Sequence, residues 1–244
     1  MNADTLPDFV RQLADNEKFT FRCHPGIDCF NECCRQLELA LSPYDVLRLK
    51  QALGITSDEF LEKYGIVEET GESAYPAVYL TMVDDGRASC PFVTSRGCSI
   101  YEGRPGACRT YPVGRGVSLH DGGKQELYVL LTEPHCHGFI DEREQDIAQW
   151  NSDQGLESYN LFNDLLLPFL QHEKIRNGYR PDEAEKDLFL LALYNLDVLR
   201  SRISMDEIIS ITGSHQAGAE KILNSDEELL QFAIRWLHKK LYNE

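Results

Sequence analysis

The chain has 244 residues, of which 42% are apolar and 26% charged, a balance that is typical of a folded globular protein and argues against a disordered or fibrous one. Its formal net charge of −16 argues against binding to nucleic acid or to an anionic lipid surface, because both require a basic face. The N-terminus has no basic segment followed by an apolar run, and the longest apolar stretches have seven residues, whereas a membrane-spanning helix needs about 20. We therefore expect a cytoplasmic protein without a nucleic-acid or membrane partner.

The first part of the chain predicts two helices separated by a strand. Residues 4–14 have the spacing of a short amphipathic helix, and residues 18–23 indicate a strand that leads to the first cysteine. Residues 42–54 predict a strong helix, because Ser42 is a favoured N-cap, a proline follows it at the first helical position, and Gly54 is a typical stop signal.

The next elements are a short helix and several strands. Residues 57–65 predict a second helix, with Ser57 as its cap. Residues 74–86 and 87–92 indicate strands around an Asp-Asp-Gly turn, and residues 116–133 predict a hairpin about Asp121-Gly122-Gly123.

The pattern becomes helical from residue 141. An apolar face runs from Trp150 to Phe169 and is interrupted at Pro168, and residues 226–241 carry acids first and bases last, as the helix dipole favours. We predict an α+β protein in which a cysteine-rich part with short strands and helices, residues 1–140, is followed by an all-helical part, residues 141–244, that packs on it.

The chain contains eight cysteines, and all of them lie in the first part: Cys23, Cys29, Cys33, Cys34, Cys90, Cys98, Cys108 and Cys136. They could form disulfides, act as small buried apolar residues, or supply thiolates to a metal. Disulfides need an oxidising compartment, and isolated core cysteines would show no clustering, so we favour metal ligation. Soft thiolates select zinc, copper(I) or iron–sulfur clusters.

Eight thiolates suffice for two four-sulfur sites, or for one such site with thiols to spare. The adjacent pair Cys33 and Cys34 is awkward for a single ion, because neighbouring side chains diverge in both helices and strands. One member of the pair is therefore a candidate for a second site or for a polynuclear cluster.

Two arginines flank Cys108. A zinc or four-iron cluster with four thiolates carries a net charge of about −2, so Arg104 and Arg109 could offset this charge or donate hydrogen bonds to sulfur. Ordinary ion pairs in an acid-rich protein explain the same residues equally well. We expect His135 and His137, on either side of Cys136, to lie outside the ligand set.

These residues resemble a known family. The order Cys33-Cys34, Cys90-Pro91, Cys98, Arg104-Pro105, Cys108-Arg109 and Tyr111-Pro112 is similar to that of the YkgJ-type cysteine-cluster proteins, also called the CxxCxxCC zinc- or iron-chelating domain, over about residues 20–138. The resemblance implies that the eight cysteines chelate zinc or iron. The spacings from Cys23 to Cys29 and from Cys29 to Cys33 are longer than those in the family's name.

The resemblance also supplies an alternative, because a flagellin lysine N-methylase carries a similar cysteine region. In that reading the chain is a cluster-dependent enzyme such as a protein lysine N-methyltransferase, and a cofactor or an anionic substrate is held by Arg104, Arg109, Tyr101 and Tyr111. No phosphate-binding loop, dinucleotide fingerprint or hydrolase motif is present in the sequence. The sequence favours a metal-binding protein and leaves open both its enzymatic activity and a protein partner for the helical part.

Overall fold

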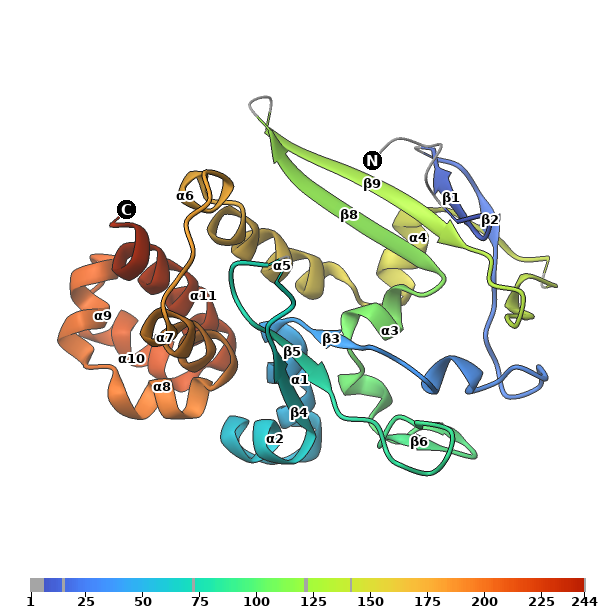
Figure 1. Cartoon of the computed structure of the whole chain (residues 1–244), viewed down its shortest axis with the longest axis horizontal. Coiled ribbons are helices and arrows are strands. Elements are labelled where there is room, and N and C mark those ends of the chain that lie inside the picture. Colours follow the sequence, from blue (N-terminus) through green and yellow to red (C-terminus); the bar gives the residue numbers. More distant parts are fainter. Residues whose placement is uncertain (1–6, 15, 72, 121–122, 141, 244) are drawn as a thin grey trace. The chain divides into compact units, whose positions relative to one another are not determined.

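The structure is a computed structural model that describes residues 7–14, 16–71, 73–120, 123–140 and 142–243 (Figure 1). Within these residues, short strands form small antiparallel sheets and helices occupy most of the second half, so the predicted α+β class is confirmed. No helix in the described ranges has the length and apolar character that crossing a bilayer requires.

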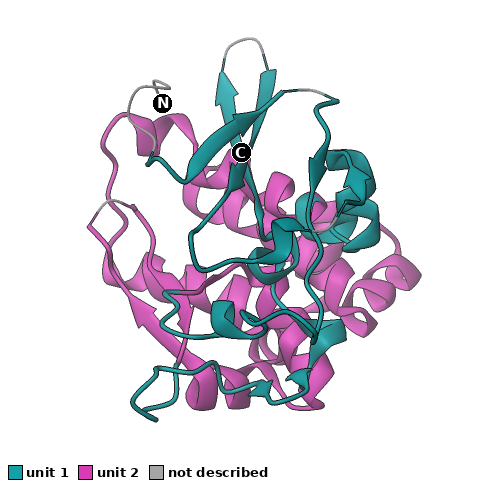
Figure 2. Ribbon diagram, turned by 90° about the vertical axis from the view of Figure 1, so that its right-hand side faces the viewer, with its two compact units in different colours: residues 1–38, 82–160 teal, residues 39–81, 161–244 magenta. Residues whose placement is uncertain are grey.

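The chain forms two compact units, and each is assembled from two separate segments (Figure 2). Unit 1 comprises residues 1–38 and 82–160, and unit 2 comprises residues 39–81 and 161–244. All eight cysteines belong to unit 1. Neither unit ends at residue 140, and the division of the chain there stays a prediction.

The main sheet of unit 1 contains β1 (Val10–Leu13), β9 (Gly123–Leu131) and β8 (Val113–His120), in the order β1-β9-β8. The predicted hairpin is confirmed as β8 and β9, although Asp121 and Gly122 at its tip lie outside the described residues.

The helix predicted over residues 4–14 is wrong where the structure describes it. Val10–Leu13 instead pairs with residues 128–131 of β9. The stretch is too short for its apolar spacing to separate a helix from a strand, and β9 offers an edge whose backbone groups need partners. Residues 4–6 of that prediction lie outside the described part of the chain.

The rest of unit 1 consists of short elements. Two further strand pairs are β2 (Phe19–Thr20) with β10 (Glu144–Gln145), and β6 (Val93–Thr94) with β7 (Gly97–Cys98). The helical pieces are η2 (Glu32–Cys34), η3 (Tyr101–Gly103), α3 (Gly106–Thr110), η4 (Gly138–Ile140) and α4 (Ile147–Asp153). The strands expected on either side of the Asp-Asp-Gly turn share a single bridge, between Val83 and Ser89.

Phe21 is the centre of an aromatic core in unit 1. Its ring meets those of Tyr111, Phe139 and Trp150 edge to face, at centroid distances of 6.0, 5.1 and 5.6 Å. A Cβ atom at residue 138 would lie 2.5 Å from the Phe21 ring, so only glycine fits at this close approach. The core thus fixes the backbone beside the first and the last cysteine.

Unit 2 combines a small sheet with a group of helices. The sheet has the order β3-β5-β4, from β3 (Ala40–Leu41), β5 (Ala77–Leu80) and β4 (Gly65–Glu68). Its helices are α1 (Pro43–Leu53), α2 (Ser57–Tyr64), most of α5 (Glu157–Leu170), α6 (Glu173–Arg176), α7 (Glu183–Tyr194), α8 (Leu196–Arg202), α9 (Met205–Thr212), α10 (Gln216–Asn224), α11 (Asp226–Leu237) and η5 (His238–Tyr242).

The ends of α1 follow the prediction. The hydroxyl of Ser42 accepts a hydrogen bond from the Asp45 backbone, the Asp45 carboxylate accepts one from the Ser42 backbone, and Gly54 ends the helix at φ 66°. The cap predicted for α2 is wrong, because Thr56 forms the capping box and Ser57 is buried. Pro168 lies inside α5 and does not end it.

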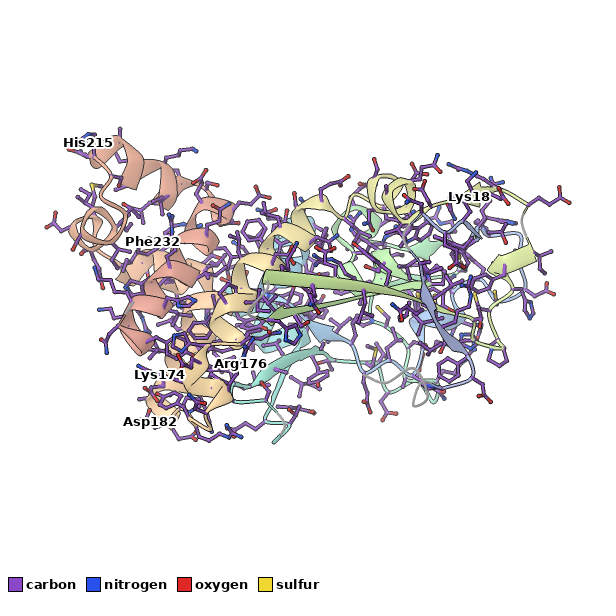
Figure 3. All side chains as sticks on the ribbon, turned by 90° about the horizontal axis from the view of Figure 1, so that it is seen from above. Lys18, Lys174, Arg176, Asp182, His215 and Phe232 are labelled. Carbon is purple, nitrogen blue, oxygen red and sulfur yellow. The ribbon has the colours of Figure 1, made fainter. Side chains whose placement is uncertain are left out.

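The core of unit 2 is built on α11 and α1. Phe232 of α11 is fully buried among the helices of unit 2, whereas His215 and Asp182 are exposed (Figure 3). Tyr44 of α1 stacks on Phe162 of α5, with ring centroids 4.4 Å apart. Residues 39–81 thus supply part of the core of the helical unit.

Candidate metal centre

All eight cysteines are described by the structure, and none of them forms a disulfide. Cys23, Cys33 and Cys108 are exposed and the others are half-buried. They occur in loops and at the ends of short elements: Cys33 and Cys34 lie in η2, Cys98 ends β7, and Cys108 is in the middle of α3. Cysteines in such positions are accessible to a metal ion, unlike those of an apolar core.

Backbone contacts bring the first cysteine loop to the last cysteine. The Arg22 amide donates a hydrogen bond of 2.8 Å to the Gly138 carbonyl, which places Cys23 beside the segment that contains Cys136. The His137 amide donates to the Cys29 sulfur at 3.1 Å. Three cysteines from the two ends of the cysteine-rich segment are therefore neighbours.

A second set of contacts joins η2 to the middle cysteines. The Cys90 amide donates to the Cys34 carbonyl at 2.8 Å. The Val93 amide donates to the Cys90 carbonyl at 3.1 Å, and Val93 pairs with Cys98 across the β6–β7 hairpin. Cys34, Cys90 and Cys98 are thus held on one compact piece of backbone.

The thiols also act on one another electrostatically. Burial raises the pKa of Cys23 to about 11, with further increases from Cys33, Cys29 and Cys136. The pKa of Cys34 is raised by its contact with the Cys33 thiol, by burial and by the charges of Cys33, Cys90 and Cys108. Both thiols are therefore protonated at neutral pH, and metal binding would release their protons.

Cys33 differs from its neighbours. Its hydrogen bond with the Cys34 thiol lowers its pKa to about 7, against the opposing effect of burial. Because the thiolate is the metal-binding form, Cys33 is the thiol best prepared to take the first bond to an incoming ion.

Across the described residues, no three His, Cys, Asp or Glu side chains converge closely enough to hold a metal ion.

The side chain of Arg109, which follows Cys108 in the sequence, is held by backbone carbonyls. Its guanidinium donates to the backbone carbonyls of Arg104, Gln154 and Glu102 at 3.0, 2.7 and 2.6 Å. It also lies over the ring of Tyr159, 5.0 Å from the centroid. These contacts hold α3, and with it Cys108, against η3 and the end of α4.

We expect Arg109→Ala to lower the free energy of unfolding of unit 1 by about 2–3 kcal/mol, because two partly buried carbonyls and one exposed carbonyl lose a charged donor. Arg96→Ala is the matched control, since the Arg96 side chain is exposed, and it should change stability by no more than about 0.5 kcal/mol. The fluorescence of Trp150 during denaturation, in a Trp236→Phe background, reports on unit 1. Equal effects of the two substitutions would show that the contacts of Arg109 do not stabilise unit 1.

Arg104 is an arginine whose charge affects the pKa values of two thiols. Burial raises the pKa of Cys98 and of Cys23, and the charge of Arg104 opposes both increases. Its guanidinium lies 3.9 Å from the centre of the Tyr101 ring and donates to the side chain of Gln154. Tyr101 itself is 54% exposed and serves as the surface on which Arg104 rests.

Buried donor groups without an acceptor surround these cysteines. Among the described residues of unit 1 they include Nε of Arg35, Nε of Arg104 and the hydroxyl of Tyr111. Burial raises the pKa of Tyr111, and Cys136 and Glu133 raise it further, so the phenol keeps its proton. Donors that find no acceptor in the protein alone fit a centre that contributes anionic sulfur.

Three residues near the thiols were not expected from the sequence. Glu133 raises the pKa of Cys33 and of Tyr111, and Gln154 and Tyr159 hold the two arginines. Their spacing in the sequence does not identify them, because only the folded structure brings them close to the cysteines. His135 is half exposed, 3.9 Å from the Glu133 carboxylate.

Comparison with family models gives one match within this geometry. Residues 22–137, which include all eight cysteines, match CxxCxxCC, described as "Putative zinc- or iron-chelating domain". The match covers 116 of the 244 residues. No curated protein and no solved structure matches the chain, and the similarity to a flagellin lysine N-methylase stays a prediction. The CxxCxxCC domain contains the whole first segment of unit 2 as well as most of unit 1.

Proposed function

We propose that the CxxCxxCC domain of this chain binds zinc, or iron in an iron–sulfur cluster, through the thiolates of its eight cysteines. The observation that supports the proposal is that eight cysteines without disulfides come from two distant segments into one unit. Such a donor set selects soft metals, and the match to a chelating domain points to the same chemistry.

The surroundings of the thiols support an anionic metal centre. A centre with four thiolates carries a charge of about −2, and Arg104 lies where its charge acts on two of the cysteines. The unmatched donors of Arg35, Arg104 and Tyr111 would find acceptors in metal-bound sulfur. On binding, the metal draws the sulfurs toward a common point and replaces their protons.

The proposal places the protein in a reducing compartment, the cytoplasm, where thiols stay available to metals. Unit 1 has many loops and short elements, so the metal supplies part of its folding free energy.

Metal analysis after anaerobic purification tests the proposal and identifies the metal. A brown protein with iron and acid-labile sulfide indicates a cluster, and a colourless protein with zinc indicates a thiolate zinc site. A protein that is isolated without either metal, and that takes up neither on reconstitution, would overturn the proposal.

We expect Tyr111→Phe to weaken metal binding about tenfold without unfolding unit 1, because the phenyl ring keeps the contact with Phe21 while a hydrogen-bond donor to the centre is lost. Competition with a chelator of known affinity measures the change. Tyr101→Phe is the matched control and should leave the affinity unchanged, since its ring stays beneath Arg104. A wild-type affinity in Tyr111→Phe would show that the hydroxyl does not serve the metal.

A further inference from the structure

We propose that the eight cysteines form two adjacent four-thiolate centres, which divide the vicinal pair between them. The first centre contains Cys23, Cys29, Cys33 and Cys136, and the second contains Cys34, Cys90, Cys98 and Cys108. This division rests on the proposed function, because it assigns ligands to the metal that the domain is proposed to bind.

The first centre is defined by contacts between the two ends of the domain. The hydrogen bonds from Arg22 to Gly138 and from His137 to the Cys29 sulfur hold three of its cysteines together. Gly138 permits this approach because a larger residue would collide with Phe21. Cys33 completes the set by elimination, because η2 directs its side chain away from that of Cys34, which belongs to the second centre.

The second centre is defined by the backbone ladder beside η2. The Cys90 amide binds the Cys34 carbonyl, and the β6–β7 hairpin returns Cys98 to the neighbourhood of Cys90. Arg109 ties α3 to η3 through the carbonyls of Arg104 and Glu102, and η3 begins three residues after Cys98. The segment that carries Cys108 is therefore fixed next to that of Cys98, which makes Cys108 the fourth member.

The geometry of η2 separates Cys33 from Cys34. A 3₁₀ helix has three residues per turn, so consecutive side chains leave it about 120° apart and cannot both face one ion without distortion. Because Cys33 and Cys34 are consecutive residues of η2, the two centres lie side by side.

Partial metal release from the wild-type chain tests the division without any substitution. The anaerobic, metal-loaded protein is treated with limiting chelator and then with N-ethylmaleimide, and intact chains with four labels are isolated and fragmented in a mass spectrometer. We expect the four labels to occupy one proposed set of cysteines. The segment 23–35 is diagnostic, because it gains three labels when the first centre is released and one, on Cys34, when the second is released.

The outcomes separate the two proposals. Four-label chains with labels drawn from both sets, or a direct passage from no label to eight, would overturn the division while leaving metal binding intact. Eight labels before any chelator is added, on a chain that contains no metal, would overturn the proposed function itself.

Paired substitutions give a second, independent measurement. Cys23→Ser with Cys136→Ser removes two ligands of one centre, and we expect it to lower the metal content of the purified chain by about half, as Cys136→Ser does alone. Cys108→Ser with Cys136→Ser damages both centres and should leave almost no metal. Far-UV circular dichroism controls for the fold of unit 2. Equal metal contents in the two double variants would overturn the division.

Discussion

Replacing Lys50 with methionine is expected to lower the free energy of unfolding of unit 2 by about 3 kcal/mol. The Lys50 ammonium is 7% exposed and lies 2.9 Å from the Asp197 carboxylate and 3.0 Å from that of Asp226. Methionine fills a similar volume but leaves two partly buried carboxylates that only Arg200 then neutralises. Denaturant unfolding followed by Trp236 fluorescence, in a Trp150→Phe background, measures the loss.

Lys221→Met is the matched control. Its side chain is 71% exposed and pairs with Glu228 at 2.6 Å, so its removal should cost less than about 1 kcal/mol. A loss as large as that of Lys50→Met would show that the ion pairs of Lys50 contribute no more to stability than an exposed pair does.

The ion pairs of Lys50 with Asp197 and Asp226 also predict how Lys50→Met responds to acid. Burial alone would raise the pKa of Asp197, but hydrogen bonds from Lys50 and Ser57 lower it to about 2. A carboxyl whose folded pKa is depressed stabilises the protein above its unfolded pKa, about 4, and loses that contribution as the pH falls toward 2. In Lys50→Met the depression is smaller, so unit 2 should unfold at a higher pH than in the wild type.

A fragment of residues 141–244 is expected to show no cooperative unfolding transition. Unit 2 takes α1, α2 and its sheet from residues 39–81. Without them Phe162 loses its stacking partner Tyr44, and Asp197 and Asp226 lose Lys50. Calorimetry of the fragment, compared with the full chain, measures the effect.

Adding residues 39–81 as a separate peptide provides the control. We expect the mixture to regain helix and a cooperative transition, because the missing part of the core is restored. A fragment that melts cooperatively by itself would show that residues 141–244 form an independent domain, as the sequence predicts.

Local signals in the sequence predicted local structure well. Ser42, Asp45 and Gly54 specify both ends of α1 because caps depend on a few neighbouring residues. The turn residues and alternation of residues 116–133 likewise predicted the β8–β9 hairpin.

The errors occur where a distant partner decides the outcome. Val10–Leu13 is a strand because β9 lies beside it, and Ser57 is buried because its hydroxyl and amide both bond to Asp197, 140 residues away. The interleaving of the two units is also invisible to periodicity, since α1 has the same amphipathic pattern whichever partner it meets.

The candidate site shows the same contrast between what local sequence predicts and what distant partners decide. Cysteine clustering indicates which residues are proposed to hold the metal, because most of the thiols occur in two dense groups. The sequence left open for both Arg104 and Arg109 whether they serve the metal or ordinary contacts; three backbone carbonyls hold the Arg109 guanidinium, whereas the charge of Arg104 opposes the rise in the pKa of Cys98. The direction in which an arginine points is set by acceptors that the fold brings from elsewhere, such as Gln154.

The central claim is that the cysteines of unit 1 are thiolate ligands of a metal and form no disulfides. The most direct test counts free thiols in freshly isolated protein that has been denatured in chelator without reductant, beside the metal content of the same sample. We predict eight free thiols in a sample that contained zinc or iron before denaturation. Four disulfides, or eight thiols in a chain that never held metal, would contradict the account.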